Sequence, residues 1–117
     1  MLYLPSLESL LASVKGSQAA LLLDSEGEVV VEAGDKQFRH RLIGAYEGIG
    51  LAEMRRIAAR HQMGALDYIL RRHAGGYVIL RPLKDGYFLI LSLGPEAAVS
   101  EGVHRSLETK ADLDADL

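Results

Sequence analysis

The chain has 117 residues, the length of one domain, and we expect a single domain over residues 1–117. Hydrophobic residues make up 49% and charged residues 25%, a balance that is typical of globular proteins and excludes a disordered chain. The chain has no cysteine, which excludes disulfides, Cys-ligated zinc and a Cys nucleophile, and its net charge of −3 argues against a dedicated nucleic-acid binder.

The first elements are a helix and a hairpin. Leucines and Val14 recur at helical spacing and predict a helix over about 5–15, which Gly16 ends. The β-branched and apolar runs 19–24 and 28–33 flank a turn and predict two strands. The first of these strands is apolar throughout, so we expect both of its faces to be covered.

A long helix is predicted over 36–61, and its apolar residues lie on two faces. One stripe holds Phe38, Leu42, Ala45, Ile49 and Ala52, which we expect to cover the sheet, whereas Ile43, Leu51 and Met54 point the opposite way. One sheet can cover only one face, so the second face predicts a partner, most simply a second copy. The small residues Gly44, Gly48 and Ala52 favour close helix approach, although a break near Gly48–Gly50 is the alternative.

The charge is concentrated in the same region. The segment from Lys36 to His73 has a net charge of +5, and the remainder −8. Within it, Arg55, Arg56 and Arg60 form a group that suits an acidic partner or a phosphate. A solvated helix end explains the group equally simply, and we prefer that interpretation.

Three further strands and a helix complete the chain. Runs at 66–72, 77–83 and 87–93 are separated by Gly75-Gly76 and Asp85-Gly86 turns, which predicts an antiparallel meander with 87–93 at the centre of the sheet. Pro95 predicts the first turn of the last helix, and the acidic end 111–117 is expected to fray. The order α-β-β-α-β-β-β-α predicts an α+β fold: one five-stranded antiparallel sheet with helices on both faces.

Residues with obvious chemistry are scarce. GAYEGIG (44–50) lacks the Lys and Ser/Thr of a phosphate loop and no strand precedes it. No two of the four histidines (His40, His61, His73 and His104) have the spacing of a helix-borne metal site, so we expect surface histidines. Asp24 and Asp85 suit turns. We therefore predict no enzyme, no catalytic or metal site and no cofactor.

The arrangement of these segments resembles the Roadblock/dynein light chain family, specifically a bacterial MglB-like stand-alone domain. The resemblance rests on AALLLDSEGEVVVEAG (19–34), on Ile43-Gly44-Ala45, on GALDYIL (64–70) and on GGYVILRPLKDGYFLILSLGPEA (75–97). It implies an interaction module, a homodimer through helix 36–61 and strand 65–73, that binds and regulates a Ras-like small GTPase as an activating co-regulator or scaffold. The interface residues predicted from the helix and this resemblance are Ile43, Gly44, Glu47, Gly48, Leu51, Met54, Arg55, His61, Tyr68 and Leu70.

Two other functions remain open at this point. A small-molecule sensor of profilin-like or PAS-like architecture would have the same sheet with helices on both sides. Nucleic-acid binding through the basic segment is opposed by the negative net charge. The first residues lack the basic region of a secretory signal and no apolar run approaches a membrane span, so we expect a cytoplasmic protein without membrane insertion.

Overall fold

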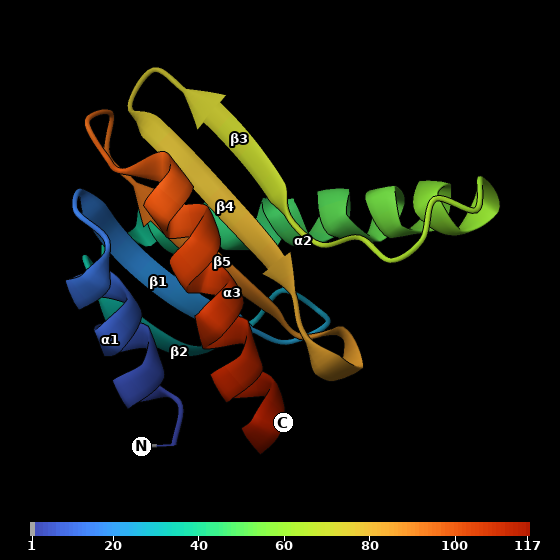
Figure 1. Cartoon of the computed structure of the whole chain (residues 1–117), viewed down its shortest axis with the longest axis horizontal. Helices are drawn as coiled ribbons and strands as arrows, with labels where there is room; N and C mark the ends of the chain where they lie inside the picture. The colour runs from blue at the N-terminus through green and yellow to red at the C-terminus, as the bar shows by residue number, and fades with distance from the viewer. Residues whose placement is uncertain (1) are drawn as a thin grey trace.

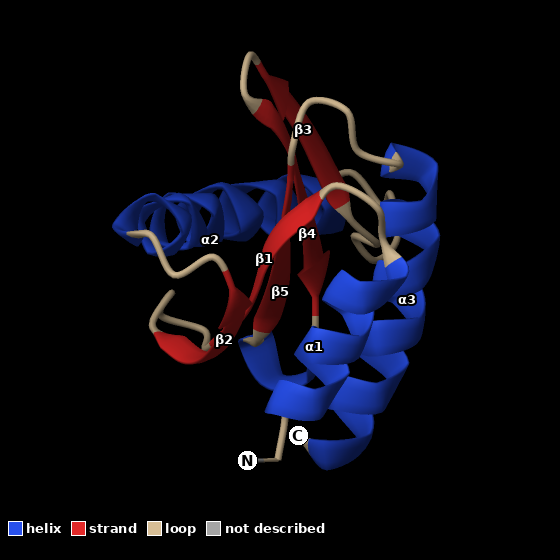
Figure 2. Cartoon of the chain, turned by 90° about the vertical axis from the view of Figure 1, so that its left-hand side faces the viewer, coloured by secondary structure: helices blue, strands red, loops and turns tan. Residues whose placement is uncertain are grey.

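The protein is an antiparallel sheet between two helical layers. The structure, a computed structural model, describes residues 2–117 apart from the side chains of Phe38 and Leu42. Its elements are α1 (Leu4–Ser13), β1 (Ser17–Leu23), β2 (Val29–Gly34), α2 (Phe38–Arg60), β3 (Ile69–His73), β4 (Gly76–Pro82), the short 3-10 turn η1 (Lys84–Gly86), β5 (Phe88–Leu93) and α3 (Val99–Asp116). The five strands pair antiparallel in the order β2-β1-β5-β4-β3. Helices α1 and α3 lie on one face and α2 on the other, so the predicted fold class is confirmed (Figures 1 and 2).

The centre of the sheet follows from the sequence. Strand β5 is buried along its whole length and pairs with β1 on one side and β4 on the other. Strand β1 is buried from Ala19 to Leu23, as a strand that is apolar on both pleat faces requires. Alternate residues of these strands point to opposite faces: Leu22 packs towards α1 and α3, whereas Leu21 and Leu23 pack towards α2.

The prediction for the faces of α2 is wrong. Leu51 is only 3% exposed and packs on the sheet, whereas Ile49 is 64% exposed and Ala45 and Ala52 are also exposed. Phe38 and Leu42, which belong to the same predicted stripe, lie outside the described side chains.

Two glycines explain this orientation, because they let α2 approach the sheet. A Cβ at Gly48 would lie 2.9 Å from Cζ of Phe88, and one at Gly44 2.8 Å from Cδ2 of Leu23. Both glycines therefore face the chain's own sheet. The helix runs from Phe38 to Arg60 without the break considered near Gly48–Gly50.

The last helix begins later and ends later than predicted. Pro95 lies in a turn, and the N–H of Ala98 donates to the carbonyl of Lys15 (3.1 Å) before α3 starts at Val99. Helix α3 continues through the acidic end to Asp116, and Leu113, 1% exposed, is part of the core between α1, α3 and the sheet.

Candidate interaction surface

Helix α2 extends beyond the sheet that supports it. Its 23 residues correspond to a length of about 35 Å. Figure 1 shows α2 crossing behind the strands, with its C-terminal part continuing past the edge strand β3 and the chain returning along it towards β3. Part of the helix is therefore not covered by the sheet or by α1 and α3.

Large apolar side chains are exposed in this region. Of the ten that are exposed in the described part of the chain, seven lie between residues 46 and 70: Tyr46, Ile49, Met54, Ile57, Met63, Tyr68 and Leu70. Concentrated exposed apolar surface of this kind marks interaction sites in soluble proteins. Gly50, Met54 and Ile57 share the flank of α2 that meets β3, whereas Ile49 lies opposite the buried Leu51 and faces away from the sheet.

Strand β3 presents an open edge beside this helix. It pairs with β4 on one side, from Ile69 opposite Leu80 to His73 opposite Gly76, and lies at the end of the sheet. Four of its five residues are exposed. It is shorter than the predicted strand, because residues 63–68 form a loop. A row of free backbone N–H and C=O groups is a template for pairing with another strand.

An ion pair connects the helix to this edge. Nε of Arg71 on β3 donates to Oε2 of Glu47 on α2 over 2.6 Å, and the Glu47 side chain is only 14% exposed. A Cβ on Gly50 would lie 3.1 Å from Nη2 of Arg71. The missing side chain of Gly50 thus leaves room for the guanidinium between helix and strand.

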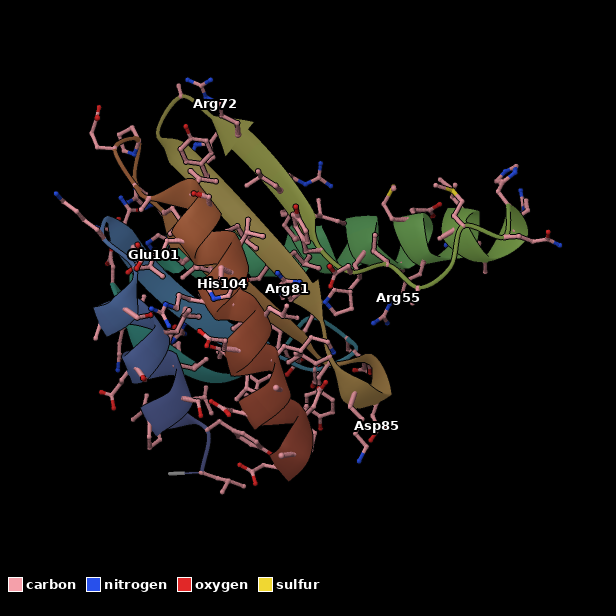
Figure 3. All side chains as sticks on the ribbon, viewed as in Figure 1. Arg55, Arg72, Arg81, Asp85, Glu101 and His104 are labelled. Atoms are coloured by element: carbon pink, nitrogen blue, oxygen red, sulfur yellow. The ribbon has the colours of Figure 1, made fainter. Side chains whose placement is uncertain are left out.

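The arginines at the end of α2 have different surroundings. Arg56 pairs with Glu53 at 3.0 Å on the exposed face of the helix. Arg55 is half-buried and lines a groove of about 530 Å³ between α2, the loop before β3 and the C-terminal half of α3. Figure 3 shows Arg55 on the projecting part of α2 and Arg72 at the tip of the β3–β4 hairpin.

The structure separates the ten predicted interface residues into two sets. Gly44, Gly48 and Leu51 contact the chain's own sheet, and Ile43 is partly buried against the same core. The second set lies at the surface around β3 and the projecting part of α2, and consists of Met54, Arg55, His61, Tyr68 and Leu70. Glu47, the remaining residue, forms the ion pair with Arg71. Tyr46, Ile49 and Ile57 belong to the exposed surface and were missed as interface residues; their only signal in the sequence is their position on the side of the helix away from Gly44 and Gly48.

Two buried polar residues were also missed. Arg81 on β4 is 1% exposed, and its only sequence signal is a charge inside the otherwise apolar run YVILRPL. His40 is 2% exposed, so the prediction of a surface histidine is wrong for it. Its Nε2 lies 3.2 Å from Oδ2 of Asp35, and this hydrogen bond holds the pKa of Asp35 below its usual range.

A further ion pair anchors the start of α2. Arg41 hydrogen-bonds to Glu32 of β2, and this contact lowers the pKa of the Glu32 carboxyl. No cluster of three potential metal ligands occurs among residues 2–117 as described. Over the same residues, none of the helices combines the length and apolar character needed to cross a membrane.

Comparison with known proteins places this geometry in a fold class. No protein-family model matches the sequence, and no curated protein matches it by sequence. Among solved structures, the Roadblock/LC7 domain from Streptomyces avermitilis superposes with a TM-score of 0.83 at 16% identity, over 92% of this chain and 91% of that one. The gliding protein MglB from Thermus thermophilus gives 0.85 at 14% identity, over 97% and 86%. A structure described as "MglB with tetrameric arrangement" gives 0.86 at 14% identity, over 97% and 85%.

The chain therefore has the Roadblock/LC7 fold, and its structure is similar to that of MglB proteins. The resemblance predicted from the sequence is confirmed at the level of the fold.

Proposed function

We propose that the protein is a homodimeric interaction module that binds and regulates a Ras-like small GTPase, and that it works in the cytoplasm. The observation that carries the proposal is the exposed apolar surface on the projecting part of α2, next to the open edge of β3. Fold similarity to MglB, including one structure described as tetrameric, supports an assembly of copies.

The two sides of α2 suit two different partners. Met54 and Ile57, on the flank beside β3, are assigned to the second copy, whose β3 would extend the sheet. Tyr46 and Ile49, which are 67% and 64% exposed, are assigned to the GTPase. Such a module needs no catalytic group of its own, because binding can bias switch loops that already have two states.

The first experiment measures mass by light scattering on a sizing column. We expect a dimer of about twice the 12.7 kDa chain mass for the wild type and a monomer for Ile57→Asp, because a buried carboxylate in a dimer seam is costly. Leu107→Asp is the matched control: Leu107 on α3 is 46% exposed and Ile57 45%, but only Ile57 belongs to the part of α2 that continues past β3. A monomeric wild type would overturn the homodimer.

The second experiment tests the GTPase. Ras-like GTPases from the same genome are loaded with GDP or a non-hydrolysable GTP analogue and mixed with the dimer. We expect a complex that depends on the nucleotide and that the double variant Tyr46→Ala, Ile49→Ala loses while remaining dimeric. A dimer that binds no GTPase in either nucleotide state would contradict the GTPase assignment. The protein would then be a scaffold for another partner.

A further inference from the structure

We propose that the Glu47–Arg71 ion pair neutralises the charge at the β3 edge. This neutralisation allows β3 to pair with β3 of a second copy of this chain. The inference rests on the proposed homodimer. Glu47 Oε2 and Arg71 Nε are 2.6 Å apart, and the Arg71 side chain is 49% exposed at the edge of the sheet.

The register of such a pairing follows from symmetry. A two-fold axis perpendicular to the sheet keeps α2 of both copies on the same face. Residues that stand opposite each other in an antiparallel pair point to the same face of the sheet. The axis between the two strands must therefore lie where one residue faces the same residue of the second copy, because neighbouring residues point to opposite faces. Strand β3 has five residues, and full overlap places the axis at its middle residue, Arg71. Ile69 then faces the second copy's position 73, and Leu70 faces position 72.

This register brings two arginines together on the α2 face. Arg71 pairs with Val78 of β4, which belongs to the core beneath α2, so its side chain lies on that side of the sheet. Side chains directly opposite in an antiparallel pair have Cβ atoms about 5 Å apart, and like charges there oppose pairing. Glu47 of each copy neutralises its own Arg71, so two neutral Arg–Glu pairs, and not two free positive charges, meet at the seam.

Gly50 provides the space for this arrangement. With a Cβ only 3.1 Å from Nη2, a larger residue would push the guanidinium away from the helix surface that holds Glu47. Arginine has five N–H donors and the contact to Glu47 uses the one on Nε, which leaves the donors of the two Nη groups for other partners. A glycine inside an exposed helix, otherwise unfavourable, has a role here.

The charge part of the proposal is tested by dimer dissociation constants from sedimentation equilibrium. At about 0.05 M salt we expect Glu47→Gln to weaken the dimer about tenfold, and the double variant Glu47→Gln, Arg71→Gln to recover most of that loss. About 0.5 M salt should also recover it for Glu47→Gln. The matched control is Glu53→Gln, which removes an exposed Glu–Arg pair of the same helix and should leave dimerisation unchanged.

The register is tested by cross-linking, which the absence of any native cysteine makes simple. Arg71→Cys should form a disulfide-linked dimer under mild oxidation, because position 71 faces itself, whereas Arg72→Cys should not. Thermal unfolding of each variant confirms that it is folded.

The outcomes are distinct. A wild type that is monomeric overturns the homodimer and this inference with it. A dimeric wild type with an unaffected Glu47→Gln variant, or a double variant as weak as the single one, overturns the charge role alone. A cross-link at position 72 in place of 71 overturns the register.

Discussion

Arg81 and Asp67 form an ion pair of 2.8 Å that joins a buried group to an exposed one: their side chains are 2% and 65% exposed. The guanidinium also donates to Oγ of Ser106 (2.8 Å) and to the carbonyl of Val103 (2.6 Å), both on α3, and lies 4.9 Å from the centre of the Tyr68 ring. Asp67 and Tyr68 directly precede β3. The pair therefore attaches the loop before the proposed dimer edge to α3.

Removing the exposed partner should be costly. We expect Asp67→Ala to lower the free energy of unfolding by about 2 kcal/mol, because the buried guanidinium then keeps only neutral acceptors. Urea unfolding measures the change, and hydrogen exchange should show faster exchange over residues 64–68. Asp112→Ala, an exposed carboxylate on α3, is the control and should change stability by less than about 0.5 kcal/mol. Equal effects of the two variants would contradict a structural role for the pair.

The orientation of α2 gives a second prediction. Leu51→Ala should destabilise the protein by about 3 kcal/mol, since it opens a cavity against Phe88 and Ile90, whereas Ile49→Ala should change stability by less than about 0.5 kcal/mol. Both are measured by urea unfolding of the monomeric Ile57→Asp variant, which separates folding from assembly. A larger loss of stability for Ile49→Ala than for Leu51→Ala would show that α2 packs on the sheet with the face predicted from the sequence.

Much of the fold could be predicted because strand and helix periodicities differ. The run at Phe88–Leu93, apolar except for Ser92, indicated the central strand, and Asp85-Gly86 indicated a tight turn, where Asp85 has φ of 60° and Gly86 of 82°. The helix faces could not be chosen correctly. Counting apolar residues gives no weight to Gly44 and Gly48, although their missing side chains are what bring α2 onto the sheet.

The candidate surface was predicted only in part, for a related reason. A second apolar face on the helix indicated a partner, but exposure distinguishes Ile49 and Ile57 from the buried Leu51, and exposure depends on tertiary packing. The Arg71–Glu47 contact joins residues 24 positions apart on different elements, so no local spacing predicts it. The buried Arg81 is likewise explained only by its acceptors on α3.

The glycines of α2 should respond differently to alanine. Gly48→Ala should destabilise by about 1–2 kcal/mol, because the new methyl group meets the ring of Phe88 in the core and the helix gains only about 1 kcal/mol in propensity. Gly50→Ala meets only the end of a flexible arginine and should stabilise the monomer by up to about 1 kcal/mol. Thermal unfolding of both variants in the Ile57→Asp background checks the contrast, and a stabilising Gly48→Ala would show that α2 lies further from the sheet.

The C-terminal end of α3 should make stability depend on pH. Burial opposes ionisation of Asp114, but hydrogen bonds from Nζ of Lys110 (2.7 Å) and from the N–H of Lys84 (2.9 Å) outweigh it, so the pKa of Asp114 is lowered. A carboxyl whose pKa is lower in the folded state stabilises the fold above its unfolded pKa of about 3.9 and loses that contribution as the pH falls through the folded value.

Asp114→Ala should therefore lower the free energy of unfolding by about 1 kcal/mol at pH 7, and the difference from the wild type should shrink as the pH falls below about 4. Urea unfolding at pH 7 and at a pH below about 4 measures this difference in the free energy of unfolding, with Asp112→Ala as the exposed control. Because Lys84 is in η1 and Lys110 in α3, the charged Asp114 holds the turn between β4 and β5 against the last helix. A loss of stability that is the same at both pH values would assign this contact to packing and not to charge.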